Sequence, residues 1–310
     1  MKRAVQILLA VFLVFLSVRA SCGEDTVTLS IRKKSLTVPV SSEYVDLDQL
    51  SLRDRDDEYR MLDDFITSLP NLKKLDMFST DIPRSRIEHL AALFPDIEFG
   101  WTMIIRCQNY THPERDIHRI RTDTTAFSTL HNKYCHGHTE EDFSVLRYCR
   151  NLLALDIGHN RVSDLSFLYD LPNLKVLIVA ANNQYLTDIT PIGSLKNLEY
   201  LEIFHNDIHD ISCLANLDHL VDLNICFNRI TDYTPLLGLK NLRRLWMADS
   251  WTGYMPVPED AASVLQEALP DCTINTWSSP TEGGWREHPR YFTLNEMFNS
   301  YKYIPFTTLE

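Results

Sequence analysis

The chain has 310 residues, of which 45% are hydrophobic and 23% are charged, and its formal net charge is -12 at pH 7. This composition is typical of a globular protein and excludes an intrinsically disordered one. The negative charge argues against nucleic acid and anionic membrane surfaces as partners, because both attract a basic face.

The first 20 residues have the layout of a secretory signal. A basic start precedes an apolar run from Ile7 to Leu16, and small residues follow up to Ala20. That run is shorter than the roughly 20 apolar residues of a membrane span, so we expect no transmembrane segment. A lipid anchor on Cys22 is the alternative, although Arg19 stands where a lipobox has an aliphatic residue. We therefore expect a secreted, extracellular or cell-surface protein.

Residues 21–105 predict an N-terminal cap followed by irregular, longer repeats. Apolar and polar residues alternate over 27–38, which indicates a β-hairpin that covers the first repeat. Strands are expected over 47–52, 72–77 and 97–105, and amphipathic helices over 57–71 and 85–96.

Residues 106–151 interrupt the repeats and predict a junction between two arrays. The segment is rich in residue types that can ligate metal: Cys107, His112, His118, Cys135, His136, His138 and Cys149. Their spacing matches no paired metal motif, so we expect no metal and structural or solvent-facing histidines. One disulfide among Cys107, Cys135 and Cys149 is expected in an exported protein, with its pairing left open. Cys213 and Cys226 fall at different repeat positions and should stay unpaired.

Regular repeats occupy residues 152–250. The first apolar residue of each Leu-x-x-Leu-x-aliphatic run recurs in steps of 22, 24, 22 and 22, at Leu152, Leu174, Leu198, Leu220 and Leu242. An asparagine stands eight residues after each of the first four: Asn160, Asn182, Asn206 and Asn228. A fixed period predicts a solenoid with a parallel sheet and short 3₁₀ turns on its outer side. Each asparagine should lie buried at a bend, where a ladder of amides satisfies backbone groups.

The consensus LxxLxLxxNxIxDIxPL, from about Leu152 to Ser250, resembles the leucine-rich repeats of bacterial internalins and phosphatase-regulatory repeat proteins. The segments LFPDIEFGWTM and GGWREHPRYFTLNEMF resemble secreted repeat proteins of gut-type Gram-positive bacteria. The resemblance implies an α/β solenoid, namely a leucine-rich repeat arc with a parallel concave sheet, a 3₁₀ or helical outer side and caps at both ends. It also implies a recognition surface, but no named ligand.

The outward-facing side chains of the concave sheet form the candidate partner-binding site. They comprise an aromatic patch and neighbouring charged residues: Tyr200, Phe204, Phe227, Trp246, Asp156, Glu202, Asp222 and Arg244. Clustered exposed aromatic residues favour an interaction site, because exposure forgoes burial worth roughly 1.5–3 kcal/mol per side chain. The alternative is that Phe204 and Phe227 pack into the bends. The acidic residues favour a partner with basic groups beside an apolar anchor.

Residues 251–310 predict a C-terminal cap and an aromatic tail. A helix is expected from about Pro258, followed by a strand through Cys272 and Ile274. The tail either folds back over the last repeat or the concave rim, which we prefer because solenoid ends require a cover, or docks a partner.

The sequence contains no nucleophile elbow, phosphate-binding loop or dinucleotide fingerprint. We therefore predict a non-catalytic protein without cofactors that binds a protein or peptide partner on the concave face. The alternatives are a metal-binding or enzymatic protein that uses the Cys/His cluster of residues 107–149, and a self-associating structural component of the cell envelope.

Overall fold

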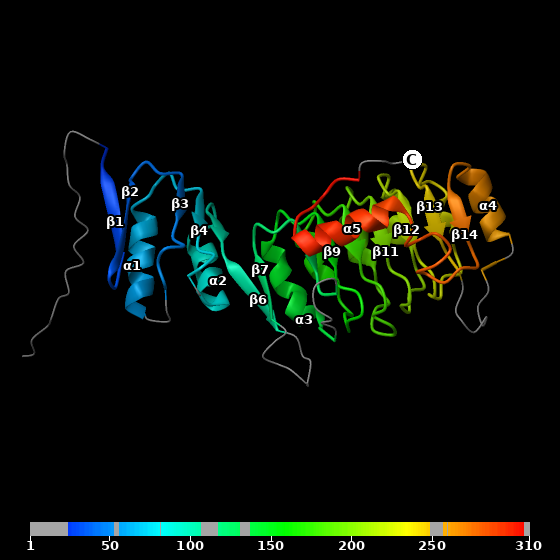
Figure 1. Cartoon of the computed structure of the whole chain (residues 1–310), viewed down its shortest axis with the longest axis horizontal. Helices are drawn as coiled ribbons and strands as arrows, with labels where there is room; N and C mark the ends of the chain where they lie inside the picture. Colours follow the sequence, from blue (N-terminus) through cyan, green and yellow to red (C-terminus); the bar gives the residue numbers. More distant parts are fainter. Residues whose placement is uncertain are drawn as a thin grey trace, which may run out of the picture. The chain divides into compact units, whose positions relative to one another are not determined.

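The computed structural model describes residues 24–52, 56–80, 82–106, 117–130, 137–248, 257–258 and 260–306. The chain divides into two compact units, Met1–Thr102 and Met103–Glu310 (Figure 1). The expected signal segment and Cys22 lie outside the described residues.

The first unit combines an antiparallel hairpin with a small parallel sheet. In chain order its elements are β1 (Thr26–Ile31), β2 (Lys34–Pro39), β3 (Tyr44–Asp46), α1 (Asp56–Thr67), β4 (Lys74–Asp76), α2 (Arg84–Leu93) and β5 (Glu98–Gly100). The strands β3, β4 and β5 pair in that order, and an amphipathic helix lies in each connection between them. Leu47, Leu50 and Leu52, expected in a strand, are buried in the loop that follows β3.

The strand expected over 97–105 is wrong as a single element. It divides into β5 and β6 (Thr102–Arg106), which belong to different sheets. Trp101 lies buried at the break, and the Thr102 hydroxyl donates to the carbonyl of Phe78 at 2.7 Å. The strand β6 pairs with β7 (Ile117–Arg121) instead of extending the parallel sheet.

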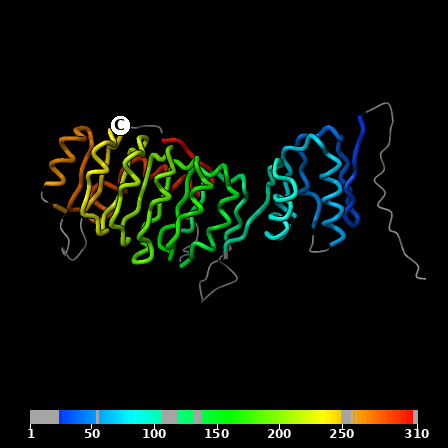
Figure 2. The backbone as a smooth tube through the Cα atoms, turned by 180° about the vertical axis from the view of Figure 1, so that it is seen from behind, coloured from blue at the N-terminus to red at the C-terminus, as the bar shows by residue number. Residues whose placement is uncertain are grey.

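The second unit is a solenoid of stacked coils, seen from its other side in Figure 2. Each coil contributes one short strand to a parallel sheet of seven: β8 (Ala126–Ser128), β9 (Ala154–Asp156), β10 (Val176–Ile178), β11 (Tyr200–Glu202), β12 (Asp222–Asn224), β13 (Arg244–Trp246) and β14 (Thr273–Asn275). The sheet therefore begins inside the expected junction. Phe127 of β8 aligns with Leu155 of β9, so an aromatic residue takes the leucine position there.

The outer side of these coils consists of short helical turns. They are α3 (Glu140–Phe143) and five 3₁₀ turns, η1 (Ser144–Tyr148), η2 (Ser166–Asp170), η3 (Thr190–Ser194), η4 (Ser212–Asn216) and η5 (Thr234–Leu236). An aspartate precedes η2 to η5 and accepts the backbone N–H two residues later, as Asp164 does from Ser166 at 2.7 Å. The helix α4 (Ala261–Ala268) lies between β13 and β14, and α5 (Pro289–Ser300) follows β14.

The four repeat asparagines join neighbouring coils. Asn182 donates to the carbonyl of Val179 at 3.2 Å in its own turn and accepts the N–H of Val162 in the preceding coil at 2.9 Å. Asn160, Asn206 and Asn228 make equivalent pairs of contacts. These amides satisfy backbone groups that no strand partner reaches inside the solenoid.

Candidate functional site: the concave face and the tail that covers it

Two rows of side chains point outward from the concave face, because alternate residues of each strand face the same side. The strand register places Tyr200 beside Asp222 and Asp222 beside Arg244 in one row. The second row carries Glu202, Asn224 and Trp246 on the same three strands. At the β8 and β9 end the first row contains only Ala126 and Ala154. The face is thus polar and aromatic over β11 to β13, whereas over β8 and β9 the first row is small and apolar and the second row carries Ser128 and Asp156.

The C-terminal tail, residues 278–306, lies across this face, and α5 passes over the strands in Figure 1. Its first part contacts β11 to β13, while its last part reaches the first coil, where the N–H of Tyr303 donates to the Thr125 hydroxyl at 2.9 Å. The tail therefore follows the first of the two alternatives drawn from the sequence, since it folds back over the sheet.

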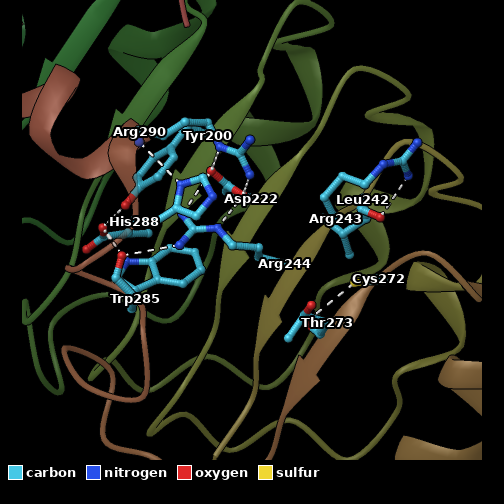
Figure 3. Close-up of polar contacts among 11 residues, drawn as sticks. Tyr200, Asp222, Leu242, Arg243, Arg244, Cys272, Thr273, Trp285, His288 and Arg290 are labelled. Atoms are coloured by element: carbon cyan, nitrogen blue, oxygen red, sulfur yellow. Dashed lines mark hydrogen bonds and ion pairs between the residues drawn. The ribbon is translucent and has the colours of Figure 1, made fainter. Parts of the chain in front are cut away.

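Asp222 is the centre of the polar contacts (Figure 3). Arg244 of the neighbouring strand donates to both of its carboxylate oxygens at 2.9 and 3.0 Å. Arg290 of α5 donates to the same two oxygens at 2.6 and 2.7 Å. All three side chains are buried. The carboxylate thus balances the charge of a sheet residue and also holds the tail.

Trp285 fills the space between the two rows. Its ring lies 5.1 Å from that of Trp246 and 5.6 Å from that of Tyr200, and the guanidinium of Arg244 lies 4.4 Å from its centre. The indole N–H donates to Glu202 at 2.8 Å, and the hydroxyl of Tyr200 donates to the same carboxylate. Burial raises the pKa of Glu202, although these two hydrogen bonds act in the opposite direction.

Three side chains of the sheet donate to main-chain carbonyls of the tail. Asn224 donates to Pro280 at 2.8 Å, Trp246 to Glu282 at 3.1 Å, and Arg244 to Trp285 at 3.2 Å. These contacts do not depend on which side chains the tail carries. Glu202 and Asp222, in contrast, contact specific side chains, those of Trp285 and Arg290.

The remainder of the tail is held by apolar packing. Leu294, Met297 and Phe298 of α5 are fully buried and form one cluster with the small and aliphatic residues of β8 to β10: Ala126, Ala154, Val176 and Ile178. Small residues on the strands leave room for a helix to approach the sheet. The exposed residue Phe292 lies on the opposite side of α5.

The expectation that the candidate residues are exposed is wrong. Tyr200 and Asp222 are 0% exposed, and Trp246 is 3% exposed, because the tail covers them. Glu202, Arg244, Asp156 and Phe204 are also buried. Phe204 belongs to the cluster beneath the tail, and the half-buried Phe227 packs against it. Sequence reasoning also missed Arg290; the signal that could have indicated a basic partner was the set of acidic residues on the strands.

Asp156 forms hydrogen bonds at the β8 and β9 end of the sheet. It lies on β9 and accepts the Ser128 hydroxyl at 2.7 Å and the backbone N–H of Gly158 at 3.1 Å. Five of the eight predicted residues, Tyr200, Glu202, Asp222, Arg244 and Trp246, are brought together around the tail.

A ridge at the ends of the strands is formed by His159, Ala181, His205 and Phe227, which occupy the same repeat position and all have a φ of 56–57°. His159 and His205 are exposed on this ridge, whereas Ala181 is buried and Phe227 is half-buried. Shallow depressions adjoin this ridge and are lined in part by Asn183, His205 and Arg229.

The Cys/His cluster expected from the sequence is described only in part, because Cys107, His112, Cys135 and His136 lie outside the described residues. His118 and His138 are buried beside Phe127 and Phe143. Cys149 is a free thiol, as are Cys213, Cys226 and Cys272. Within the described part of the chain, no three His, Cys, Asp or Glu side chains are grouped to hold a metal ion.

Comparison with known proteins identifies the repeats. Residues 150–194 and 196–236 match the family of leucine-rich repeats. No curated protein matches the chain. Together with the parallel sheet and the 3₁₀ turns, this match shows that the second unit is a leucine-rich repeat solenoid.

Solved structures of similar proteins include two internalins from Listeria monocytogenes. Internalin C2 is 26% identical with a TM-score of 0.38, and the alignment covers 52% of this chain and 78% of that one. The second internalin is 20% identical with a TM-score of 0.37, covering 70% and 65%. A leucine-rich repeat protein from Leptospira interrogans is 20% identical with a TM-score of 0.41, covering 74% and 59%.

None of the helices in the described ranges has the length and apolar character needed to cross a bilayer.

Proposed function

We propose that this chain is a non-catalytic recognition protein of the secreted, internalin-like class, which binds a protein or peptide partner on the concave face of its repeats. One observation carries the proposal: the concave face already holds a peptide segment. It binds residues 280–290 through main-chain carbonyls, a buried aromatic side chain and a buried guanidinium. Proteins use these contact types to bind extended peptides.

The extracellular setting rests on the N-terminal pattern of a basic start, an apolar run and small residues. The eight predicted residues keep their place in the proposal, but five of them, Tyr200, Glu202, Asp222, Arg244 and Trp246, contact the tail in the described state. A partner therefore meets Tyr200, Glu202, Asp222 and Trp246 only when the tail moves off the sheet. With the tail in place, a partner meets the outer side of α5 or the ridge around His205.

The proposal is tested by capture of extracellular proteins on three forms of the purified full chain. They are the wild type, a Trp285→Ala/Arg290→Met variant with a weakened tail, and the same variant with Tyr200→Phe and Glu202→Met in the groove. A captured protein is then purified and titrated against each form. We expect the second form to bind it most tightly and the groove substitutions to weaken binding.

The control is Phe292→Ala, which alters an exposed ring of the tail and should leave binding unchanged. A purified partner that binds all forms with equal affinity would contradict binding at the concave face.

A further inference from the structure

The charged side chains of the sheet keep contacts of their own when the tail is removed. Asp222 keeps the bidentate contact of Arg244, its neighbour on β13. Glu202 keeps the hydrogen bond from Tyr200. Asp222 and Arg244 therefore form an ion pair within the sheet, Glu202 keeps one hydrogen-bond donor there, and the tail adds a further contact to each. A surface whose polar groups retain these contacts stays formed without its occupant.

The surface contacts the bound segment in two distinct ways, through its main chain and through its side chains. Asn224, Trp246 and Arg244 donate to three carbonyls of the tail, which fixes the path of the backbone over six residues, Pro280 to Trp285. Glu202 accepts the indole N–H of Trp285. Asp222 accepts two hydrogen bonds from Arg290, five residues further along the chain. Backbone contacts supply general affinity, whereas paired side-chain contacts supply specificity.

We propose that residues 280–290 are an internal ligand that blocks a peptide-binding groove, and that the outside partner presents the same chemistry. That partner is a protein segment with an aromatic N–H donor at one position and a guanidinium five positions later. This inference rests on the proposed function and adds the identity of the recognised groups. Because the tail is covalently attached, it competes at an effective concentration in the millimolar range, so the intact protein is self-blocked.

The chemistry excludes other occupants of the same length. A segment with phenylalanine in place of tryptophan leaves Glu202 without its second donor. Lysine in place of arginine cannot donate to both oxygens of Asp222 in the geometry of the guanidinium. An acidic segment would place its negative charge beside the carboxylates of Glu202 and Asp222 in a buried site, where like charges repel.

The test uses a synthetic, fluorescently labelled peptide with the sequence of residues 278–306 as the probe. It is titrated against the full chain carrying Trp285→Ala/Arg290→Met, whose own tail lacks both recognised side chains, and against the wild-type chain. We expect saturable binding to the variant and at least 10-fold weaker binding to the wild type. Hydrogen exchange of the β9 to β12 amides verifies that the repeats of the variant remain folded.

Peptides with single substitutions distinguish specific recognition from nonspecific binding. Peptides with Trp285→Phe or Arg290→Lys should each bind roughly 10-fold more weakly, as expected for the loss of a hydrogen bond to a charged group. A peptide with Phe292→Ala is the control and should bind like the parent, since this ring is 61% exposed in the docked tail. Replacing Tyr200 and Glu202 of the chain by Phe and Met should abolish the difference between the Trp and Phe peptides.

Displayed random 12-residue peptides, panned against the same variant, provide the second measurement. We expect enrichment of Trp and Arg five positions apart.

The proposal would be overturned if the labelled peptide did not bind to a variant with folded repeats, or if the Phe292→Ala, Trp285→Phe and Arg290→Lys peptides bound equally. If the variant fails to fold, a protease site inserted at the exposed Trp277 yields a nicked wild-type chain for the same exchange experiment. Dimers formed by tail exchange, detected by sedimentation, would make a second copy the occupant and would also overturn it. If the peptide experiment fails, the capture of a partner through another surface can still be tested. The internal-ligand proposal and the proposed function can therefore be refuted independently.

Discussion

Replacement of Asp222 by alanine should destabilise the second unit severely. The side chain is fully buried, and it is the shared acceptor of Arg244 and Arg290, whose side chains are 7% and 2% exposed. Removing it leaves two buried guanidinium groups without their carboxylate. Breaking a buried ion pair costs about 3–5 kcal/mol, which is a large part of the roughly 5–15 kcal/mol that holds a domain together.

The assay is urea unfolding of the full chain, followed by circular dichroism and by tryptophan fluorescence, to which the buried Trp246 and Trp285 contribute. The matched control is Asp218→Ala, which removes an exposed aspartate four residues earlier and should change the free energy of unfolding by less than about 0.5 kcal/mol. A second variant, Asp222→Leu with Arg244→Met and Arg290→Met, removes all three charges together. It should recover most of the lost stability, because apolar groups of similar volume replace buried ion pairs at little cost.

A loss below about 1 kcal/mol for Asp222→Ala would refute the reasoning, because it would mean that water reaches the two guanidinium groups. A triple variant as unstable as the single one would also refute it, because the cost would then come from shape and not from charge.

Three further predictions concern the ladder, the tail cap and the thiols. Asn182→Ala should lower the free energy of unfolding by about 1–3 kcal/mol, because it leaves buried backbone groups unpaired, whereas the exposed Asn216→Ala should have little effect in the same urea assay. Burial, assisted by the neighbouring Arg244 and Arg290, lowers the pKa of His288 to about 4, and its ring caps α5 by accepting a backbone N–H. The docked tail should therefore be fully stabilised above pH 6.5 and loosen as the pH falls towards 4, as measured by tryptophan fluorescence; in His288→Asn this dependence should disappear. Burial raises the pKa of Cys213 to about 11 and that of Cys149 to about 12, so iodoacetamide at pH 8 should label both only after unfolding, as read by peptide mass spectrometry; labelling in the native state would contradict it.

The repeat architecture is predictable from the sequence because it follows from local spacing. A period of 22–24 residues with an asparagine after each strand predicts the coils, and an aspartate before each return predicts the 3₁₀ turns. The first strand of the sheet, β8, could not be predicted from the repeat spacing, because it carries Phe127 where the other strands carry an aliphatic residue. Its neighbours give no periodic signal, so only the stacking against β9 defines it.

The occupied concave face could not be predicted in the same way. Alternation along a strand separates core-facing from outward-facing residues, but it does not say whether the outward face meets water. The contacts that cover the face join residues far apart in sequence, such as Asp222 with Arg290 and Glu202 with Trp285. The aromatic residues Tyr200 and Trp246 were correctly placed on the concave side, and their burial depends on a segment with no repeat pattern of its own.

The two halves of the tail interface have different physical bases, and this difference bears on how the tail is released. Around α5 the contacts are apolar, so burial of Leu294, Met297 and Phe298 supplies most of the free energy of docking. Around Trp285 and Arg290 hydrogen bonds and ion pairs accompany the packing of the Trp285 ring on Trp246 and Tyr200, and the cost of removing the charges from water offsets much of what the ion pairs contribute. The charged contacts of this polar half therefore fix the register of the tail more than its affinity. A partner that binds the sheet residues around Asp222 and Glu202 can displace only the part of the tail around Trp285 and Arg290. It then need not overcome the whole free energy of docking, provided that α5 remains on β8 to β10.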